Sequence, residues 1–424
     1  MEWQADSFEF KKYQISKDRT AIDFIYQLIF KDGKKLDFIE KIFLPQAIPS
    51  TVSSNLLNKV LENLHLILGI SYYKLYCPRN INTQYFLTEE QINFWNTVYT
   101  KGLGEFFYKN KIDFRGLGLV DFGPVPESRE RSTIQGSTFK KEKDKTLIGI
   151  GGGKDSIVMA ELLKEQRKNI TGYVLKNKNS DFAIQKKVLE LMRIDYLVVE
   201  REMDKKLFNL NKKPGSFNGH VPISAIYAFT GLFLALIYGF SEVILAQEKS
   251  ANEGNVKYLG ETINHQWSKS EEFEQMFQRY VKRFVTSEVT TYSILRKYSE
   301  LEIIKEFAKQ EKYFSVFSSC NKNSKINNKI DKLWCGQCAK CAFVFLTLAA
   351  YLPKDKIIKI FGKNLFADES LLPLYKDLLG RGQMKPFDCV GTFKEANEAL
   401  SLVISKGEFN EDIIIKNLNL DLKT

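Results

Sequence analysis

Alternating apolar and polar positions near the start of the chain predict β-strands. Residues 21–26 and 36–43 are rich in aromatic and β-branched side chains, and Asp32-Gly33 between them is a hairpin signal. Helical spacing of apolar residues follows at 56–67, and Thr88-Glu89-Glu90-Gln91 is typical of a capping box that opens a second helix. We identify no catalytic motif in residues 1–122 and interpret them as an α+β accessory domain.

The pattern changes after this region. Residues 123–145 are rich in Pro, Ser, Arg and Lys without an apolar period, which predicts a linker. We then expect strands at 146–150, 172–175, 196–200 and 242–247, with helices at 157–167 and 182–192. This alternation predicts an α/β catalytic domain at 146–424 with a mostly parallel, doubly wound sheet, whose ligands bind beyond the carboxyl ends of the strands. We place a helical part at its C-terminal end.

Residues 221–241 carry no charged side chain and approach the ~20 residues that cross a bilayer. We interpret them as a fully buried helix, because Pro222, Ser224 and Thr230 interrupt the run and strand-like segments flank it. The start of the chain lacks the features of a signal peptide. We therefore expect a cytoplasmic protein without membrane attachment, with its cysteines reduced.

Composition adds little to this picture. The chain has 424 residues with 44% hydrophobic content, which suffices for a large core and for two domains. The net charge of +11 would suit RNA or a phosphorylated small molecule. However, the lysines are spread along the chain, so a general compositional bias explains the charge equally well.

The most informative motif follows the first strand of the α/β half. It reads Gly151-Gly152-Gly153-Lys154-Asp155-Ser156 and precedes a helix. Glycines let backbone amides approach a phosphate, and the start of a helix directs free N–H groups at the anion. Lys154 is a candidate catalytic residue that could supply charge to the phosphates, Asp155 could contact a metal or ribose, and Ser156 could donate its hydroxyl. A glycine-rich turn without a ligand is the alternative.

Polar loops after later strands are expected to face the same site. Ser250, Asn252 and Glu253 follow the strand at 242–247 and offer contacts for a ribose, a base edge or a metal ion. An ordinary turn with helix-capping side chains is the alternative. His220 and His265 also lie in polar or Gly-rich loops, where a histidine can act as acid or base, although either could be structural.

Four cysteines have the spacing of metal ligands. Cys335, Cys338 and Cys341 form two overlapping C-x-x-C steps, and Cys320 lies fifteen residues before the first of them. Four thiolates at these spacings could hold a structural zinc ion. An iron–sulfur cluster and an incomplete site are the alternatives. Cys389 lies outside this group.

The glycine loop resembles the Ser-Gly-Gly-x-Asp-Ser loop of PP-loop pyrophosphatases, with Gly151 in place of the usual serine. With the polar loop and the cysteines, it resembles the PP-loop superfamily, which has an adenine nucleotide alpha hydrolase-like fold and includes zinc-bearing 7-cyano-7-deazaguanine synthases. A larger ordered set of motifs is similar to the UDP-N-acetylmuramoyl-L-alanyl-L-glutamate epimerases over most of the chain. The set comprises residues 151–156, 218–222, 250–255, 264–266, 334–341 and 385–392.

This resemblance implies an ATP-dependent isomerase of peptidoglycan precursor synthesis. Its partners would be ATP with Mg²⁺ and the UDP-linked muramoyl dipeptide, whose terminal L-glutamate becomes D-glutamate as AMP and diphosphate are released. Adenylation of the carboxylate is a sensible first step, because it removes a negative charge beside the carbanion that would form. We expect His265 to be the base at Cα, with Cys389 as the second candidate.

Two other functions fit parts of the sequence. An adenylating enzyme of nucleobase or tRNA modification would use the basic charge to bind nucleic acid, although no RNA-binding module is recognisable. A catalytically inactive ATP-binding regulator would need little beyond the phosphate loop. The polar loops that follow it argue against that regulator, and the epimerase interpretation requires no nucleic acid. The oligomeric state is not predictable from the sequence.

Overall fold

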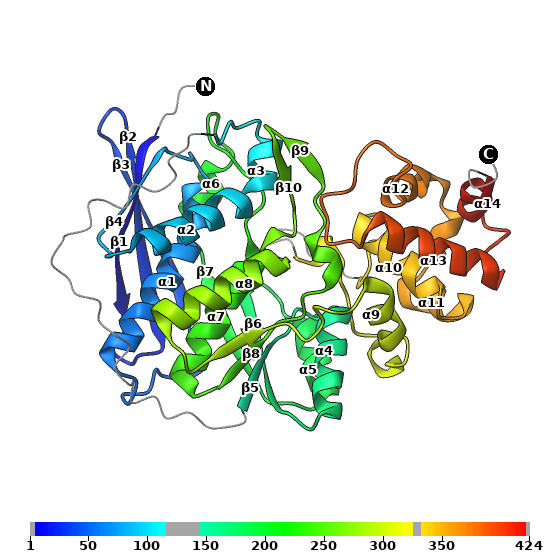
Figure 1. Cartoon of the computed structure of the whole chain (residues 1–424), viewed down its shortest axis with the longest axis horizontal. Helices are drawn as coiled ribbons and strands as arrows, with labels where there is room; N and C mark the ends of the chain where they lie inside the picture. Colours follow the sequence, from blue (N-terminus) through cyan, green and yellow to red (C-terminus); the bar gives the residue numbers. More distant parts are fainter. Residues whose placement is uncertain (1–4, 116–144, 325–331, 421–424) are drawn as a thin grey trace.

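The computed structural model describes residues 5–115, 145–324 and 332–420. The expected linker at 123–145 lies outside the described residues except for Lys145, which opens a strand. A sheet covered by helices forms the body, and a lobe of C-terminal helices lies at the other end of the long axis from the N-terminal strands (Figure 1). Among the described residues, no helix has the length and apolar content to span a bilayer.

A nine-stranded sheet organises the molecule, with strand order β11-β8-β5-β6-β7-β3-β2-β1-β4. The five strands from β11 to β7 are parallel to one another, which confirms the mostly parallel sheet predicted from the sequence. They are β5 (Lys145–Gly149), β6 (Asn169–Asn177), β7 (Tyr196–Glu202), β8 (Glu242–Ile244) and β11 (Thr290–Tyr292). The first of them, β5, lies between β6 and β8. The strand order therefore reverses at β5, and such a reversal opens a crevice beyond the carboxyl ends of the strands.

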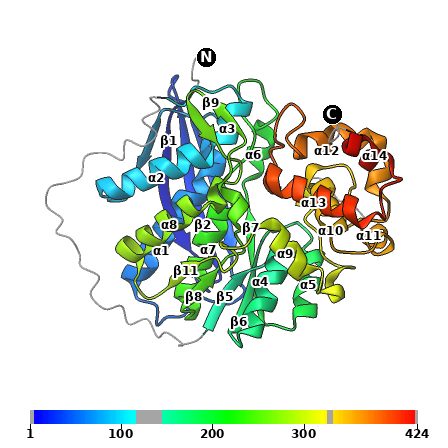
Figure 2. The same ribbon diagram turned by 45° about the vertical axis from the view of Figure 1, so that its right-hand side comes forward.

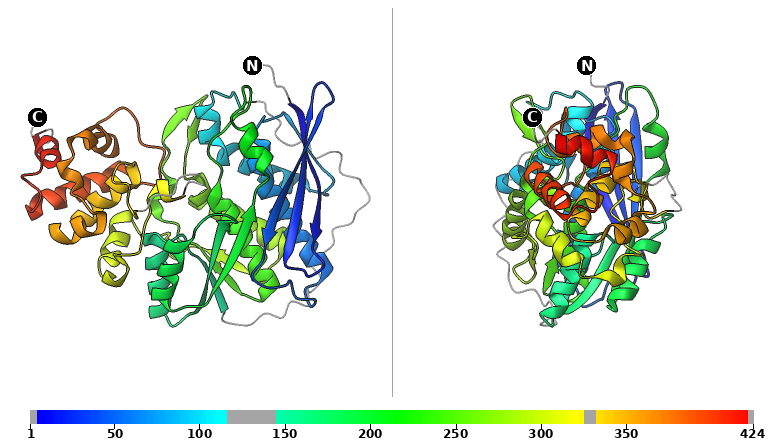
Figure 3. Two further views of the ribbon diagram at one scale, coloured as in Figure 1. Left: turned by 180° about the vertical axis from the view of Figure 1, so that it is seen from behind. Right: turned by 90° about the vertical axis from the view of Figure 1, so that its right-hand side faces the viewer.

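The N-terminal strands extend the same sheet. They are β1 (Ala5–Ile15), β2 (Ala21–Phe30), β3 (Lys35–Phe43) and β4 (Asn80–Thr83). The predicted hairpin joins β2 to β3, with Gly33 at a φ of +81°, which glycine adopts without strain. β3 pairs antiparallel with β7, for example at Ile42 and Arg201, so the region expected to be an accessory domain shares its sheet with the parallel half. From behind, these strands show a face without helices (Figure 3).

Two apolar cores cover the two faces of the parallel half. Successive residues of a strand point to opposite faces, and Leu147 and Val243 pack in one core whereas Ile148 and Ile244 pack in the other. The first core contains α1 (Ser54–Tyr73), α2 (Glu89–Gly102), α3 (Gly104–Lys109), α6 (Lys205–Leu210), α7 (Ile223–Tyr238) and α8 (Glu271–Tyr280). The second contains α4 (Lys154–Glu165), α5 (Ala183–Met192) and α9 (Glu300–Phe307), which Figure 2 shows together beside β5 and β6.

Helix α7 is the uncharged run at 221–241. It packs against α1 and against strands β5 and β8, and its side chains are almost all buried. The run is therefore a buried helix of the body, as predicted. The capping box at Thr88 is also present, since Thr88 and Gln91 exchange side-chain and backbone hydrogen bonds at the start of α2.

The C-terminal lobe consists of helices packed around α10. They are α10 (Ala339–Ala349), α11 (Lys354–Phe361), α12 (Leu372–Leu378), α13 (Phe393–Lys406) and α14 (Ile413–Leu420). The segment between α12 and α13 returns to the body near a small hairpin of β9 (Val256–Tyr258) and β10 (Glu261–Ile263) (Figure 1). There Pro386 O accepts a hydrogen bond of 2.9 Å from Asn255 Nδ2. This return segment thus reaches the crevice side of the sheet.

Candidate functional site

The glycine loop occupies the reversal point of the sheet. Strand β5 ends at Gly149, and α4 begins at Lys154, three residues earlier than expected from the sequence. Gly152 has a φ of +85°, a conformation that other residues rarely adopt. A Cβ atom at Gly151 would meet nothing within 4 Å among the described residues. The loop therefore has open space at Gly151, just before the start of a 12-residue helix, and the start of a helix favours an anion.

Lys154 lies inside the protein beneath this loop. Its side chain is fully buried, and its Nζ lies 2.5 Å from Glu300 Oε2 and also pairs with Asp155. Burial by itself lowers the pKa of Lys154, but the charges of Asp155 and Glu300 raise it, so the ammonium stays charged. Lys154 therefore holds Asp155 in place as part of a buried ion-pair network. Ser156 Oγ donates to Gly153 O at 2.9 Å.

Two further lysines, Lys269 and Lys340, act electrostatically on both the glycine loop and Cys389. Burial by itself raises the pKa of Asp155, but Lys154, Lys340 and Lys269 lower it. The charges of Lys269 and Lys340 also lower the pKa of Cys389. Both lysines are thus within electrostatic range of the loop and of the thiol. Lys269 is also within range of the carboxylates of Glu248 and Glu300, so buried groups of both signs lie near the loop.

The structure brings together Cys389 and His265, the two residues predicted to handle the proton, and adds Glu105 from α3. The return segment brings Cys389 beside His265, because Gln266 Nε2 donates a hydrogen bond of 3.4 Å to Val390 O, and His265 lowers the pKa of the Cys389 thiol. His265 Nδ1 lies 2.5 Å from Glu105 Oε2 and must donate, because an ionised carboxylate only accepts. We call these three residues the Cys389–His265–Glu105 triad. His220 lies beside it, with its Nδ1 3.4 Å from Glu105 Oε2 and its ring centroid 4.6 Å from that of His265.

The triad carries opposite charges near neutral pH. Burial by itself raises the pKa of Cys389, but Lys269 and the hydrogen bond with His265 lower it to about 6. Burial by itself lowers the pKa of His265, but its hydrogen bonds with Cys389 and Glu105 raise it to about 9. Burial and the charge of His265 lower the pKa of His220 to about 3, so this second imidazole is neutral. A thiolate and an imidazolium therefore face each other next to a neutral histidine.

The polar loop after β8 supports the triad. Asn255 Oδ1 accepts a hydrogen bond of 2.8 Å from the backbone N–H of His265, while its Nδ2 binds the return segment. Asn252 Oδ1 accepts from Glu271 N at the start of α8, as the helix-capping alternative anticipated. Glu253 pairs with Lys385 at 3.3 Å. Ser250 Oγ is buried without a hydrogen-bond partner among the described residues.

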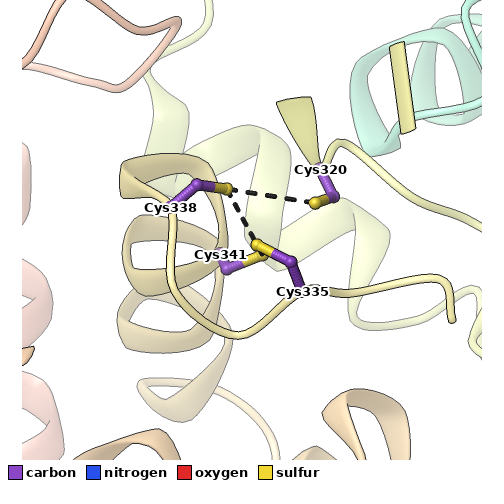
Figure 4. Close-up of side chains that lie close together, drawn as sticks. All are labelled: Cys320, Cys335, Cys338 and Cys341. Atoms are coloured by element: carbon purple, nitrogen blue, oxygen red, sulfur yellow. Dashed lines mark hydrogen bonds between the residues drawn. The ribbon is translucent and has the colours of Figure 1, made fainter. Parts of the chain in front are cut away.

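The four cysteines of the predicted metal site lie together (Figure 4). Their sulfur atoms all lie within 4.8 Å of one another, with separations of 4.0 Å for Cys320 and Cys338, 3.7 Å for Cys335 and Cys341, and 3.5 Å for Cys338 and Cys341. A tetrahedral ion with bonds of ~2.3 Å places its sulfurs about 3.8 Å apart. The four residues could therefore hold a single metal ion. An iron–sulfur cluster would need wider spacing, because its cysteines bind different iron atoms.

The cysteine group adjoins the candidate site. Ser318, two residues before Cys320, donates its backbone N–H to Gly152 O at 3.2 Å. Lys340, which acts on Asp155 and Cys389, lies between Cys338 and Cys341 on the sequence. The group therefore anchors the glycine loop on one side and Lys340 on the other.

A hollow of about 840 Å³ adjoins the polar loop. Its lining includes Asn252, Gly254, Asn264 and Gln275, but neither the glycine loop nor Cys389. The hydrogen bonds and charges described above, rather than this hollow, mark where chemistry can take place.

Sequence patterns assign no role to several residues of this site. Glu105 lies in the N-terminal region, where the sequence shows no catalytic motif. Lys269 lies outside the ordered set of motifs, and Lys340 lies inside the cysteine motif without a role predicted for it. The one available signal for Glu105 was a carboxylate next to Phe106 and Phe107 in an apolar helix, where burying a charge is costly unless it is paired.

Comparisons with known proteins cover nearly the whole chain. A family model described as the MurL N-terminal domain matches residues 1–294, and one described as the MurL C-terminal domain matches residues 316–424. A relative from Micromonospora sp., named UDP-N-acetyl-alpha-D-muramoyl-L-alanyl-L-glutamate epimerase, is 34% identical over 418 residues. That match spans 97% of this chain and 90% of the relative.

Two further relatives carry the same name. The one from Xanthomonas oryzae pv. oryzae is 34% identical over 425 residues, spanning 98% of this chain and 91% of the relative. The one from Salinispora tropica is 33% identical over 419 residues, spanning 97% of this chain and 88% of the relative. The similarity thus includes every segment that contributes to the triad and to the cysteine group.

Proposed function

This chain belongs to the MurL family, and from that premise we propose that it inverts the terminal L-glutamate of UDP-N-acetylmuramoyl-L-alanyl-L-glutamate to D-glutamate in peptidoglycan precursor synthesis. The family predicted from the sequence motifs is thereby confirmed. The observation that best supports the reaction is the Cys389–His265–Glu105 triad, which lies within range of the same lysines as the glycine loop. A proton at Cα could be removed there beside an activated carboxylate.

We propose that activation is transfer of AMP from ATP to the α-carboxylate, with release of diphosphate. A free carboxylate opposes loss of the Cα proton, because the carbanion would form beside a negative charge. A mixed anhydride with AMP removes that charge and acidifies the Cα–H bond. Consumption of ATP therefore makes possible the removal of a Cα proton that is too weakly acidic in the free carboxylate.

The glycine loop supports this use of ATP. The amides of Gly151, Gly152 and Gly153 and the start of α4 would bind phosphate oxygens, and Ser156 could add its hydroxyl. Asp155 is the residue that would hold Mg²⁺ with ATP, and Lys154 would orient it through their ion pair.

The polar loop supplies further candidate contacts for ATP. The buried hydroxyl of Ser250 and the carboxylate of Glu253 remain candidates for the ribose or the base. Asn252 could contribute through its Nδ2, because its Oδ1 already accepts from the backbone of Glu271.

We propose that His265 is the base at Cα. The imidazolium must first release its own proton. The negative charge of Cys389 is one of the causes that raise the pKa of His265 and so favour its protonated form. Loss of that negative charge during the reaction would therefore convert His265 into a base. His220, a neutral imidazole 4.6 Å away, is the nearest second group that could carry a proton.

We also propose that the four cysteines hold one structural zinc ion. The short sulfur separations support a single tetrahedral ion, and the contact of Ser318 with Gly152 supports an architectural role beside the glycine loop. Zinc would supply no chemistry to the reaction in this proposal.

The reaction can be tested directly. Supplied in D₂O with UDP-N-acetylmuramoyl-L-alanyl-L-glutamate, ATP and Mg²⁺, the protein should form the D-glutamyl epimer with deuterium at Cα. One AMP and one diphosphate should appear per turnover, because each activation consumes one ATP. Chiral analysis of the hydrolysed product and mass spectrometry measure both results, and free glutamate serves as the poor substrate for comparison.

One outcome would reject the epimerase proposal. If ATP is consumed but glutamate returns with its configuration unchanged and without deuterium, the activity lies elsewhere. An adenylating enzyme of nucleobase modification would then be the better proposal, because it also needs the glycine loop, the cysteine group and the positive charge.

A further inference from the structure

We propose that Cys389 is a nucleophile that takes the glutamyl group from AMP, so that epimerisation takes place on an enzyme-bound thioester. This inference rests on the proposed function, which supplies the acyl-adenylate. It assigns separate tasks to Cys389 and His265. It also explains why a protonated histidine lies where a base is needed.

The geometry is that of an activated nucleophile. Cys389 lies beside His265, because the neighbouring residues are joined by a hydrogen bond of 3.4 Å from Gln266 Nε2 to Val390 O. His265 is oriented by Glu105 at 2.5 Å, so the order is that of nucleophile, base and orienting carboxylate in acyl transfer. Asn255 fixes the register of the two segments, because it binds the backbone of His265 and of Pro386 at once. Cys389 is partly exposed, whereas Cys77 is fully buried.

Electrostatics places this thiol beside the activation site. Lys269 and Lys340 act on both Cys389 and Asp155, so the thiol and the glycine loop lie within electrostatic range of the same two lysines. An acyl-adenylate bound at the loop would thus present its carbonyl within the same region. The lowered pKa of Cys389, about 6, keeps the sulfur as the nucleophilic thiolate at neutral pH.

The chemistry balances without an added reagent. The thiolate attacks the acyl-adenylate carbonyl, the C–S bond forms, the C–O bond to phosphate breaks, and AMP leaves with the electron pair. The sulfur is now uncharged, so His265 loses a partner that raised its pKa and can release its proton to solvent. His265 then takes the Cα proton, and a proton from solvent returns to Cα on the opposite face, which leaves His265 as the imidazolium. Water finally cleaves the C–S bond, which releases the D-glutamyl carboxylate and restores the thiolate, with two protons lost to solvent.

A single-turnover experiment on the wild-type protein tests the thioester. The protein is mixed with substrate, ATP and Mg²⁺, quenched in acid during the first turnover, and digested for peptide mass spectrometry. The peptide that contains Cys389 should carry the substrate acyl group, and hydroxylamine should release it. Absence of any adduct on Cys389 while deuterium is entering Cα would overturn the proposal.

Variants give an independent readout. Cys389→Ala should keep ATP–diphosphate exchange, which also reports that it folds, but lose epimerisation by at least about 10³-fold. The acyl-adenylate should then stay on the protein, with AMP release slowed. Cys77→Ala is the matched control and should keep both activities, because Cys77 is a buried structural residue.

The two proposals fail in different ways. Retention of more than a tenth of wild-type epimerisation by Cys389→Ala would remove the thioester and leave the epimerase proposal intact. Lack of substrate-dependent ATP–diphosphate exchange in the wild-type protein would instead reject adenylation, and with it the source of the thioester.

Discussion

The charge of His265 is set by residues from two other parts of the chain. Glu105 comes from α3, and Cys389 comes from the return segment between α12 and α13. Both raise the pKa of His265 to about 9, while the Lys269 charge helps to lower that of Cys389 to about 6. Between these pH values the thiolate and the imidazolium exist together.

This charge pair predicts a pH profile for Cys389. Alkylation by iodoacetamide requires the thiolate, so its rate should rise as pH increases through about 6 in the wild-type protein. His265→Ala removes a group that lowers the pKa of the thiol, so the midpoint should move to higher pH. Peptide mapping measures the rate at Cys389 separately from the other cysteines.

Cys77 provides the internal control for this profile. Burial raises the pKa of Cys77 to about 12, so it should stay unmodified over the same range. The same midpoint in the wild-type protein and in His265→Ala would contradict the hydrogen-bonded triad. His265→Ala should also retain ATP–diphosphate exchange while losing Cα exchange.

Sequence patterns found some residues of the site and missed others for a physical reason. His265 and Cys389 were singled out because they lie in polar loops and in motifs of an ordered set. Glu105, Lys269 and Lys340 are common charged residues whose importance depends on what lies next to them in space. No local pattern could show that these distant segments converge.

Among the elements, the unit formed by β5, the glycine loop and α4 has specific requirements on its backbone conformation. The open backbone at Gly151, the positive φ of Gly152 and the helix start at Lys154 form the part of the site that local sequence specifies best. Its position beside the reversal of strand order follows from the sheet as a whole. We propose that this unit binds the phosphates of ATP.

Single substitutions in this unit should lower the interaction with ATP while the protein stays folded. Asp155→Ala should lower ATP–diphosphate exchange by about 10²–10³-fold, because a contact to charged phosphates or Mg²⁺ is lost, while Lys154 keeps its pair with Glu300. Ser156→Ala should lower exchange as well, with a stability cost of about 1 kcal/mol for one hydrogen bond. A radioactive exchange assay and urea unfolding measure the two effects.

Ser401→Ala is the matched control for these variants. Ser401 lies exposed on α13, where its hydroxyl bonds only the backbone of Asn397, so exchange should not change. Wild-type exchange in both Asp155→Ala and Ser156→Ala would reject the glycine loop as the phosphate site.

The observed ends of the strands and helices differ from those that the local sequence pattern predicts. Strand β8 ends at Ile244 rather than 247, because Gln247 N bonds the side chain of Ser293 instead of a neighbouring strand. Helix α4 begins before the apolar period, since Lys154 turns inward to an ion pair that the sequence does not reveal. Helix and strand identity followed from periodicity, whereas their ends depended on tertiary contacts.

At the scale of the whole molecule, the cysteine group connects the body to the C-terminal lobe. Cys320 follows the segment that bonds Gly152, and Cys338 and Cys341 bracket Lys340 at the start of α10. The buried ion pair of Glu40 with Arg201, 2.5 Å apart, similarly joins β3 to β7. The spacing of the cysteines predicted the first link, whereas the pairing of Glu40 with Arg201 could not be predicted, because these residues are distant in the chain and belong to no motif.

A zinc ion in this position makes a measurable prediction. Elemental analysis should give one zinc per chain, and Cys338→Ser should lose it and lower the free energy of unfolding. Zinc sites in small peptides contribute ~10–16 kcal/mol of apparent binding energy, so the stability loss should be large. ATP–diphosphate exchange should fall too, because the support of Gly152 and Lys340 is weakened.

Cys389→Ser is the control for this measurement, since Cys389 lies outside the group and should leave the zinc content unchanged. Protein purified without chelator that contains no stoichiometric metal would contradict the site. Two equivalents of metal would instead show that Glu105, His220 and His265, whose ligand atoms also lie within 4.8 Å of one another, bind a second ion.

The triad is divided between the two regions that the family models match, so the proposed reaction requires both regions. The region at 1–294 carries the glycine loop, Glu105 and His265, and the region at 316–424 carries Cys389 and Lys340. In the mechanism proposed above, the first region alone would lack the thiol and the support that Ser318 and Lys340 give to the glycine loop. The second region alone would lack the glycine loop, the base and its orienting carboxylate. Neither region could therefore carry out the reaction by itself, and a single gene for both supplies them in equal amounts.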